Sequence, residues 1–317
     1  MRCNTRSVVS AGATAAKEFE ATRRDRLGGL EHTFLGAGGD VPLPTWRRYL
    51  DGSRLGYLAD HRVMGCNVFP GAGYVEMALA AGRSLYGAPY CVAERIRFEA
   101  PVILRAGTGY LLDTTLDQVT GRVAIYGRQP GSEHWVRHAS ARLTPAAVAA
   151  PVLDLDAIRA RCSAPRDGSR FYTDIRGHGF DYGPAFRPIA RIWLGDGEAV
   201  GEFRSDALFA SAGDDLVLNP VALDGCFQML LPLISAVVEE HATLLPVGAD
   251  RIIVHSRPSG PLWVHASATR SVGTDLTGDA VLTTADGHAV IEVRGVRARL
   301  VGARAAGTNP ARQPVAA

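Results

Sequence analysis

The sequence predicts an α+β fold in which one unit, a long apolar helix accompanied by several strands, occurs twice in tandem. Most of the chain consists of short runs of β-forming residues separated by Gly, Pro and Asp, which is typical of an antiparallel sheet. Two segments interrupt this pattern, and both are apolar on nearly every side, as in a helix that is buried all round. They run from Gly71 to about Leu85 and from Pro220 to about Glu239.

The strands fall into two sets, one associated with each apolar helix. The first set is predicted at residues 96–104, 110–118, 121–128 and 135–143, and the second at 190–204, 250–257, 262–270 and 275–300. A helix buries its whole circumference only when a sheet curls around it. The sequence therefore predicts a double hot dog, in which each of two tandem units is a long buried helix wrapped by an antiparallel sheet.

The domain organisation follows from this division. We expect an N-terminal hot dog over residues 31–145 and a C-terminal hot dog over residues 166–302. Between them, residues 146–165 are rich in Ala, Pro and polar side chains and are predicted as a connector with a short helix at Leu153 to Arg161. Residues 1–30 are expected to form a linker or a weakly ordered segment, and residues 303–317 a flexible tail.

Composition excludes several function classes. The 317 residues are 47% apolar, enough for a large core, and the net charge of +2 gives no reason to expect nucleic-acid binding. Five scattered cysteines favour a reduced, cytoplasmic protein over a disulfide framework. We find no apolar stretch of membrane-spanning length, no Cys-x-x-Cys or His-Glu-x-x-His metal signature, and no Gly-x-Ser-x-Gly elbow of a serine hydrolase.

Asp224 lies inside the second apolar segment, where a charged side chain is costly. Asn219 is a good N-cap and Pro220 a favoured first helical residue, so Asp224 falls at the fifth helical position, past the first turn. Burial disfavours the ionised carboxylate, and a carboxyl group that stays protonated can act as a general acid. Gln228 follows four residues later on the same face. The residue alone is equally consistent with a structural hydrogen bond or an arginine pair.

His61 stands at the head of a Gly- and Pro-rich turn that leads into the first apolar segment. Taken alone, a histidine there is more often a core or surface residue than a catalyst. Gly65 allows close backbone approach, and Pro70 and Gly71 set the entry to the helix. Amide groups near such a turn are free to bind a developing negative oxygen, so one corner can hold both a base and an oxyanion site.

Four motifs lie in a fixed order along the chain. They are His61-x-x-x-Gly65-x-x-x-x-Pro70, GFDYGPAFR at 179–187, LDGCFQ at 223–228 and LPVGADRI at 245–252. Together they resemble the motifs of the dehydratase domains of modular polyketide synthases, and the resemblance covers about residues 43–300. The chain departs from the family at Asn219 and Arg187, where His and Gln are commoner.

The resemblance implies a double hot-dog fold and a specific reaction. Water is removed by syn elimination from a 3-hydroxyacyl thioester, which leaves an α,β-unsaturated enoyl thioester in polyketide biosynthesis. The substrate is carried on the phosphopantetheine arm of an acyl carrier protein, and no metal or diffusible cofactor is used. The implied partners are that carrier protein and other polyketide synthase domains, with a homodimer also consistent with the family; no nucleic-acid or membrane partner is expected.

The same resemblance assigns roles to the candidate residues. It implies that His61 removes a proton from C2 and that Asp224 protonates the C3 hydroxyl as it leaves. Tyr182 and Gln228 would hold that hydroxyl or orient Asp224. The further supporting positions lie in the turns of the motifs, with the oxyanion expected at backbone amides near Gly65 or Gly71: Gly65, Pro70, Gly71, Gly183 and Pro184.

Two other functions remain open at this stage. A cyclase on the same scaffold would use the same two groups, either to follow dehydration with oxa-Michael closure of a pyran or furan, or to direct an aldol cyclisation. A non-catalytic double hot dog would bind acyl chains or dimerise a larger assembly. An inactive scaffold has no physical need for both an acid and a base, and this favours the enzymes.

Overall fold

The structure is a computed structural model, and it describes residues 33–39, 43–51, 56–87, 91–204, 215–234, 243–272 and 275–301. The segments expected to be a linker (1–30) and a tail (303–317) lie outside these residues. Within the described part, no helix is long and apolar enough to span a membrane.

One antiparallel sheet of thirteen strands runs through both halves of the chain, in the order β1-β2-β6-β7-β8-β5-β12-β15-β14-β13-β11-β10-β9. Its N-terminal strands are β1 (Ala37–Gly39), β2 (Thr45–Asp51), β5 (Val92–Phe98), β6 (Gly109–Leu116), β7 (Arg122–Arg128) and β8 (Val136–Thr144). Its C-terminal strands are β9 (Arg166–Asp167), β10 (Ile189–Leu194), β11 (Glu198–Phe203), β12 (Thr243–Val254), β13 (Leu262–Val272), β14 (Asp275–Thr284) and β15 (Ala289–Val301).

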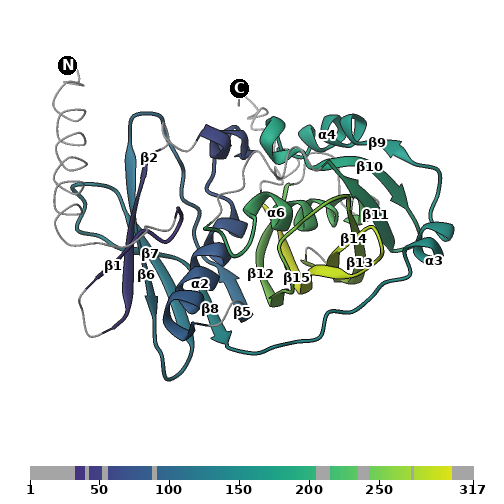
Figure 1. Ribbon diagram of the computed structural model, residues 1–317. Coiled ribbons are helices and arrows are strands. Elements are labelled where there is room, and N and C mark those ends of the chain that lie inside the picture. Colours follow the sequence, from purple (N-terminus) through teal and green to yellow (C-terminus); the bar gives the residue numbers. More distant parts are fainter. Residues whose placement is uncertain are drawn as a thin grey trace, which may run out of the picture.

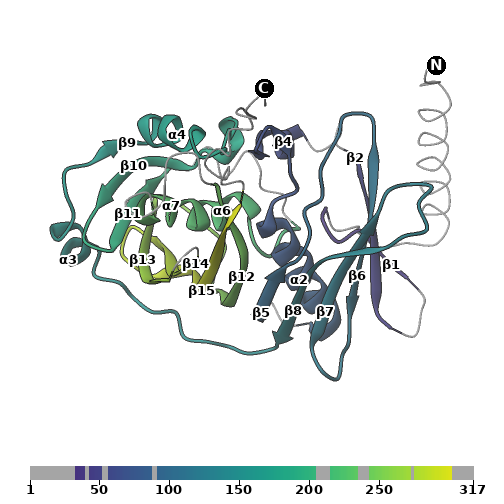
Figure 2. The same ribbon diagram turned by 180° about the vertical axis from the view of Figure 1, so that it is seen from behind.

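Each half of the sheet curls around one helix, as the sequence predicts. The helix α2 (Gly71–Tyr86) lies against β5, β6, β7 and β8, and α6 (Pro220–Gln228) lies against β14 and β15 (Figure 1). The two helices also contact each other where the halves meet, and the view from behind shows the same arrangement (Figure 2). The halves are further joined by pairing of β5 with β12, for example at Ala93 and Ile252.

The first buried helix follows the sequence prediction closely. It begins after Pro70, an extended N-cap residue, and it ends at Gly87, whose left-handed φ of 63° lets its amide donate to the Arg83 carbonyl. Eleven consecutive residues, 72–82, are buried. Gly73 permits this close packing, because a Cβ atom there would lie 2.6 Å from the Phe69 ring.

The continuous second helix predicted as far as about Glu239 is wrong at residues 229–230. There α6 ends at Gln228, and a separate short helix, α7 (Leu231–Ile234), follows. Pro232 is the physical reason, because proline has no N–H for the carbonyl of Gln228 and its ring would clash with that carbonyl in a continuing helix. Residues 235–242 lie outside the described part of the chain.

The strand predicted over 96–104 is also shorter than expected, and its remainder supports the turn after His61. The strand β5 ends at Phe98, and Pro101 follows. Residues 102–104 bond to the loop before α2 instead: Phe69 N–H donates to the Val102 carbonyl at 2.9 Å, and Leu104 N–H donates to the Asn67 carbonyl at 2.8 Å.

A further helix, α4 (Gly168–Arg176), has no counterpart in the sequence prediction. Asp167 caps it by accepting a hydrogen bond from Ser169 N–H at 2.7 Å, and Phe171, Tyr172 and Ile175 form its buried face. In Figure 1 it lies beside β9 and β10, over the C-terminal half. Its buried face brings Tyr172 to the functional site described below.

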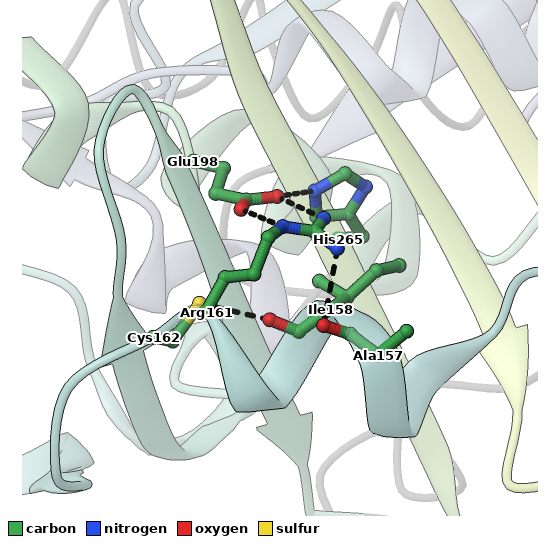
Figure 3. A network of polar contacts seen from close by, with 6 residues as sticks. All are labelled: Ala157, Ile158, Arg161, Cys162, Glu198 and His265. Carbon is green, nitrogen blue, oxygen red and sulfur yellow. Dashed lines mark hydrogen bonds and ion pairs between the residues drawn. The ribbon is translucent and has the colours of Figure 1, made fainter.

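The connector crosses the outside of the molecule and is fastened to the C-terminal sheet. It runs from β8 to α3 (Leu155–Ala160), the short helix that the sequence predicts there (Figure 1). Ile158 packs on Trp193 and Val200. Arg161 binds both carboxylate oxygens of Glu198, at 2.7 and 2.9 Å, and Glu198 also binds His265 Nε2 at 2.9 Å (Figure 3).

Candidate active site

His61 lies between the 3-10 helix η1 (Gly56–Asp60) and a small hairpin formed by β3 (Arg62–Val63) and β4 (Cys66–Asn67). Its ring is buried, and Nδ1 lies 2.8 Å from the carbonyl oxygen of Val68. Because a carbonyl oxygen only accepts, Nδ1 carries the hydrogen in this contact. In the neutral ring Nε2 therefore presents a lone pair, as a base requires.

The hairpin turn after His61 explains Gly65 differently from the sequence prediction. Met64 and Gly65 have φ values of 52° and 75°, the left-handed pair that a two-residue hairpin turn requires. Gly65 is exposed, and a Cβ atom there would meet nothing within 4 Å, so the close backbone approach expected at this residue is not found. At Gly71 a Cβ atom would lie 3.1 Å from the Phe98 ring, a tight contact that a shift of the ring by a few tenths of an ångström would relieve.

Asp224 comes from the other half of the chain and faces His61. The Asn219 side chain accepts hydrogen bonds from Val221 and Ala222 N–H at 2.9 and 3.2 Å, which starts α6 and places Asp224 at the predicted fifth position. Its Oδ1 lies 3.5 Å from His61 Nε2, and both side chains are buried. At this separation the two groups are adjacent without forming a normal hydrogen bond.

The orientation of Asp224 is set by Gln228, as the four-residue spacing predicts. Gln228 Nε2 donates to Asp224 Oδ2 at 2.8 Å and to the Phe186 carbonyl at 3.0 Å, and its Oε1 accepts from Tyr172 O–H at 2.9 Å. Tyr172 in turn accepts from Ile189 N–H at 3.1 Å. Because the Phe186 carbonyl only accepts, Gln228 Nε2 must face it, and the amide cannot rotate by 180° without losing this bond.

Two buried tyrosines of the site stay protonated. Burial raises the pKa of Tyr172 above its ordinary value, and the nearby carboxyl of Asp224 raises it further. Burial likewise raises the pKa of Tyr182 well above its ordinary value, with Asp224 as the second cause. Both phenol groups are therefore available as hydrogen-bond donors across the working pH range.

Aromatic rings enclose the histidine. The ring centres of Tyr182 and Phe186 lie 5.3 and 5.0 Å from that of His61, and Phe186 stacks on Tyr57 at 6.2 Å. Phe186 belongs to a single 3-10 turn, η2 (Pro184–Phe186), which Pro184 begins. These rings cover the His–Asp pair, whose side chains are 8% and 7% exposed.

The loop that carries Tyr182 is fastened to the loop that carries His61. Gly183 N–H donates to the Asp60 carbonyl at 2.7 Å, and Ala185 N–H donates to Asp60 Oδ2 at 2.9 Å. A Cβ atom on Gly183 would lie 2.3 Å from the Asp60 carboxyl carbon, so this contact requires glycine. The motif positions Gly183 and Pro184 therefore shape the turn and the contact between the halves.

The structure thus brings together His61, Asp224, Gln228 and Tyr182, with Pro70 and Gly71 at the adjoining helix start. Sequence analysis missed Tyr172, which binds Gln228, and Asp60, which binds the loop that carries Tyr182. Tyr172 could have been found from the Asp167 cap followed by apolar residues at helical spacing, and Asp60 only from its position next to His61.

Two other features bear on ligands. Among the described residues, no three His, Cys, Asp or Glu side chains are arranged to hold a metal ion. A small apolar cavity lies between α2 and strands β5, β7 and β8, with Tyr74, Phe98 and Ile125 in its lining, but His61 and Asp224 do not line it.

Comparison with known proteins identifies the family. The model described as "Polyketide synthase dehydratase domain" matches residues 32–128, and the one described as "Polyketide synthase dehydratase N-terminal domain" matches residues 150–308. Among curated relatives, mycoketide-CoA synthase of Mycobacterium tuberculosis is 31% identical over 244 residues, which are 73% of this chain and 6% of the relative. The pikromycin synthase component PikAII of Streptomyces venezuelae is 31% identical over 268 residues, 78% of this chain and 7% of the relative.

These relatives are much longer proteins, and the chain spans only a small part of each. Among solved structures, the dehydratase domain from the CurF module of curacin polyketide synthase superposes with a TM-score of 0.76 at 25% identity, covering 86% of this chain and 100% of that one. This match confirms the predicted double hot dog. With both halves matched by family models and the His–Asp pair assembled between them, the chain belongs to the polyketide synthase dehydratase family.

Proposed function

We propose that the chain removes water by syn elimination from a 3-hydroxyacyl thioester carried on an acyl carrier protein, with no cofactor, to give an α,β-unsaturated thioester. The observation that carries this proposal is the 3.5 Å separation between His61 Nε2 and Asp224 Oδ1. Each positioned acid or base of this kind typically accelerates a reaction by about 10²–10⁴-fold. The carrier protein and other polyketide synthase domains are the proposed partners, consistent with the multidomain relatives.

The base in this reaction is His61. Its Nδ1–H is held by the Val68 carbonyl, so the Nε2 lone pair is directed to the side where Asp224 lies. Nε2 takes the proton from C2 of the substrate, and the C–H electron pair forms the C2–C3 double bond. The contact with Val68 also stabilises the imidazolium that results, because Nδ1–H is a stronger donor in the charged ring.

The acid is Asp224, and its hydrogen-bond partners determine which oxygen carries the proton. Oδ2 already accepts from Gln228 Nε2, so the proton resides on Oδ1, the oxygen nearest His61. Oδ1–H protonates the C3 hydroxyl as the C3–O bond breaks, and the product is water. Gln228 and its Tyr172 bond keep Oδ1 aimed at the substrate.

The spacing of the pair favours syn over anti elimination. Groups whose reacting atoms are 3.5 Å apart reach the same face of a substrate placed beside them. An anti elimination would need the acid and base on opposite faces, separated by the thickness of the acyl chain. After one turnover His61 holds an extra proton and Asp224 lacks one, and their proximity allows the product water to return it.

The enolate-like oxygen that develops on the thioester needs hydrogen-bond donors. Gly71 is the first residue of α2, and the amides of a first helical turn have no acceptor within the helix. The positive end of the helix dipole adds to their effect. We therefore place the oxyanion at Gly71 rather than at the exposed Gly65, and we expect about a 10²–10³-fold contribution from such a donor.

The direct test is to incubate the purified chain with both enantiomers of a 3-hydroxyacyl carrier-protein thioester and to measure mass and enoyl absorbance. We expect one enantiomer to lose water and to gain the absorbance of a conjugated double bond. A ring-closed product has the same mass as the enoyl thioester but lacks this absorbance, which separates the cyclase alternative. Binding of both enantiomers without turnover would instead support the non-catalytic alternative.

Two variants complete this test. His61→Ala and Asp224→Asn should each abolish elimination, with circular dichroism unchanged, because each removes one proton-transfer group and leaves the other in place. More than about a tenth of wild-type activity in either variant is incompatible with these roles, since a positioned acid or base contributes at least ~10²-fold.

A further inference from the structure

Glu76 is a fully buried carboxylate on α2 that the proposed reaction does not use. It lies in the middle of the run of buried residues on this helix, with an exposed fraction of 0%. Its Oε1 accepts a hydrogen bond from Val217 N–H at 2.9 Å, and its Oε2 accepts one from Leu218 N–H at 2.6 Å. Both donors are peptide groups of the other half of the chain.

Burying a carboxylate in an apolar helix costs several kcal/mol unless it is well bonded, so its presence needs a physical reason. Here the two charge-assisted bonds satisfy two consecutive peptide N–H groups of residues that lie outside any strand or helix. A carboxylate accepts at both oxygens, whereas an amide of the same size accepts at one and donates at the other. The site is therefore specific for the acid.

The two amides lie immediately before the helix that carries Asp224. Leu218 precedes Asn219, the N-cap of α6, and Asp224 lies five residues after that cap. At the other end, α2 begins directly after the loop whose Val68 carbonyl holds the His61 ring. Glu76 thus joins the element that follows the base to the element that carries the acid.

A second bond from α2 reaches the same segment. The Arg83 guanidinium donates through Nη2 to the main-chain oxygen of Asp215. Arg83 is two helical turns beyond Glu76, so the two side chains hold residues 215–218 along one side of α2. The segment 215–218 is therefore bonded to the helix through its backbone, in addition to the packing of its buried side chains.

We propose that Glu76 is a positioning residue of the dehydratase reaction, which holds the start of α6 against α2 so that Asp224 Oδ1 stays beside His61 Nε2. This inference rests on the proposed function of the pair. In this proposal one buried carboxylate, which binds two peptide groups, keeps the acid and the base aligned across the two halves. A displacement of about 1 Å at a catalytic group can cost about 10²-fold in rate.

The test uses Glu76→Gln with Glu292→Gln as a matched control. Glu292 is also buried, at 7% exposed, and accepts from His255 and Arg294 at 2.7 and 2.8 Å on β15. We expect kcat for the 3-hydroxyacyl thioester to fall about 10- to 100-fold in Glu76→Gln, with KM nearly unchanged. In Glu292→Gln we expect a comparable loss of thermal stability and an unchanged kcat.

A second measurement does not depend on activity. Hydrogen–deuterium exchange should accelerate in peptides covering residues 215–224 in Glu76→Gln and remain unchanged there in Glu292→Gln. If Glu76→Gln does not fold, Arg83→Met takes its place in the test. Arg83 is half-buried and binds the same segment, so we expect this variant to exchange faster than wild type in residues 215–224 and to show a smaller fall in kcat than that expected for Glu76→Gln.

The outcomes separate this inference from the proposed function. A wild-type chain that dehydrates neither enantiomer defeats the proposed function, while the exchange data still report whether Glu76 holds residues 215–224. An active wild type with equal kcat and equal exchange in folded Glu76→Gln overturns the positioning role and leaves the function standing. Equal falls in kcat for Glu76→Gln and Glu292→Gln would also overturn it, because the effect would then be general destabilisation.

Discussion

At the scale of single residues, the orientation of Asp224 depends on a chain of buried hydrogen bonds through Gln228 and Tyr172. Gln228 is held by a donor on one side and two acceptors on the other, and it leaves Asp224 only one oxygen free to donate. Tyr172 begins this chain, and its raised pKa keeps it a donor. The acid is thus oriented by residues that never touch the substrate in the proposed reaction.

We predict that Tyr172→Phe lowers kcat about 10-fold and destabilises the fold by about 1–3 kcal/mol. The variant removes the donor to Gln228 Oε1 and leaves the Ile189 N–H without its acceptor, and unsatisfied buried groups cost about this much. Kinetics with the 3-hydroxyacyl thioester and urea unfolding measure the two effects. Tyr110→Phe is the control, because it removes a similar bond to His138 at 3.0 Å outside this network. Equal kcat values for Tyr172→Phe and the wild type would contradict the orienting role.

At the scale of elements, the connector helix α3 is fastened to the C-terminal sheet by charges as well as by packing. The pKa of Glu198 is lowered to about 2, most strongly by its hydrogen bond with Arg161 and less strongly by that with His265 (Figure 3). Arg159 adds to the attachment by lying over the rings of Trp193 and Trp263, at 5.2 and 5.0 Å from their centres. The connector is therefore part of the folded C-terminal half in this structure.

This lowered pKa predicts a pH-dependent contribution to stability. Because the carboxyl ionises more readily when folded than when unfolded, its contribution is complete above its ordinary pKa and is lost as the pH falls toward 2. We expect wild type to exceed Glu198→Gln by about 1–2 kcal/mol in unfolding free energy near pH 7, and by less near pH 3, as urea titrations would show. Arg161→Met should weaken this trend. A difference that stays constant from pH 7 to pH 3 would refute the explanation.

At the scale of the whole molecule, the halves are joined by a shared sheet and by the contact of α2 with α6. The reacting groups come one from each half, and Asp60 bonds the loop that carries His61 directly to the loop that carries Tyr182. Neither half contains both groups, so the joint between the halves also creates the site.

We predict that a cut in the exposed connector, between residues 146 and 150, leaves the function intact when both pieces are produced together. The pairing of β5 with β12 and the buried contact of the helices should hold the pieces together without the covalent link. Each piece produced alone should be inactive on the 3-hydroxyacyl thioester. Co-purification and turnover measure this outcome, and turnover by the N-terminal piece alone would disprove the division of the site.

Much of this architecture could be predicted because it depends on local patterns. The apolar run after Pro70 and the cap at Asn219 are short-range signals, and so is the four-residue spacing of Asp224 and Gln228. The break of the second helix at residues 229–230 could also have been predicted, because Pro232 disfavours a continuous helix there. The early end of β5 was harder to foresee, since residues 102–104 bond to a loop rather than to a strand.

By itself, the sequence predicted the two wrapped helices, His61 and Asp224 as the candidate base and acid, and the family whose motifs the chain shares. Only the tertiary structure decided that His61 and Asp224 lie 3.5 Å apart, which oxygen of Asp224 is free, and which carboxylate bonds α2 to the segment before α6. The physical reason is that propensity, capping and helical spacing act between near neighbours in the chain. The bonds of Tyr172, Asp60 and Glu76 join residues 56, 125 and 141 positions apart, and only packing brings those together.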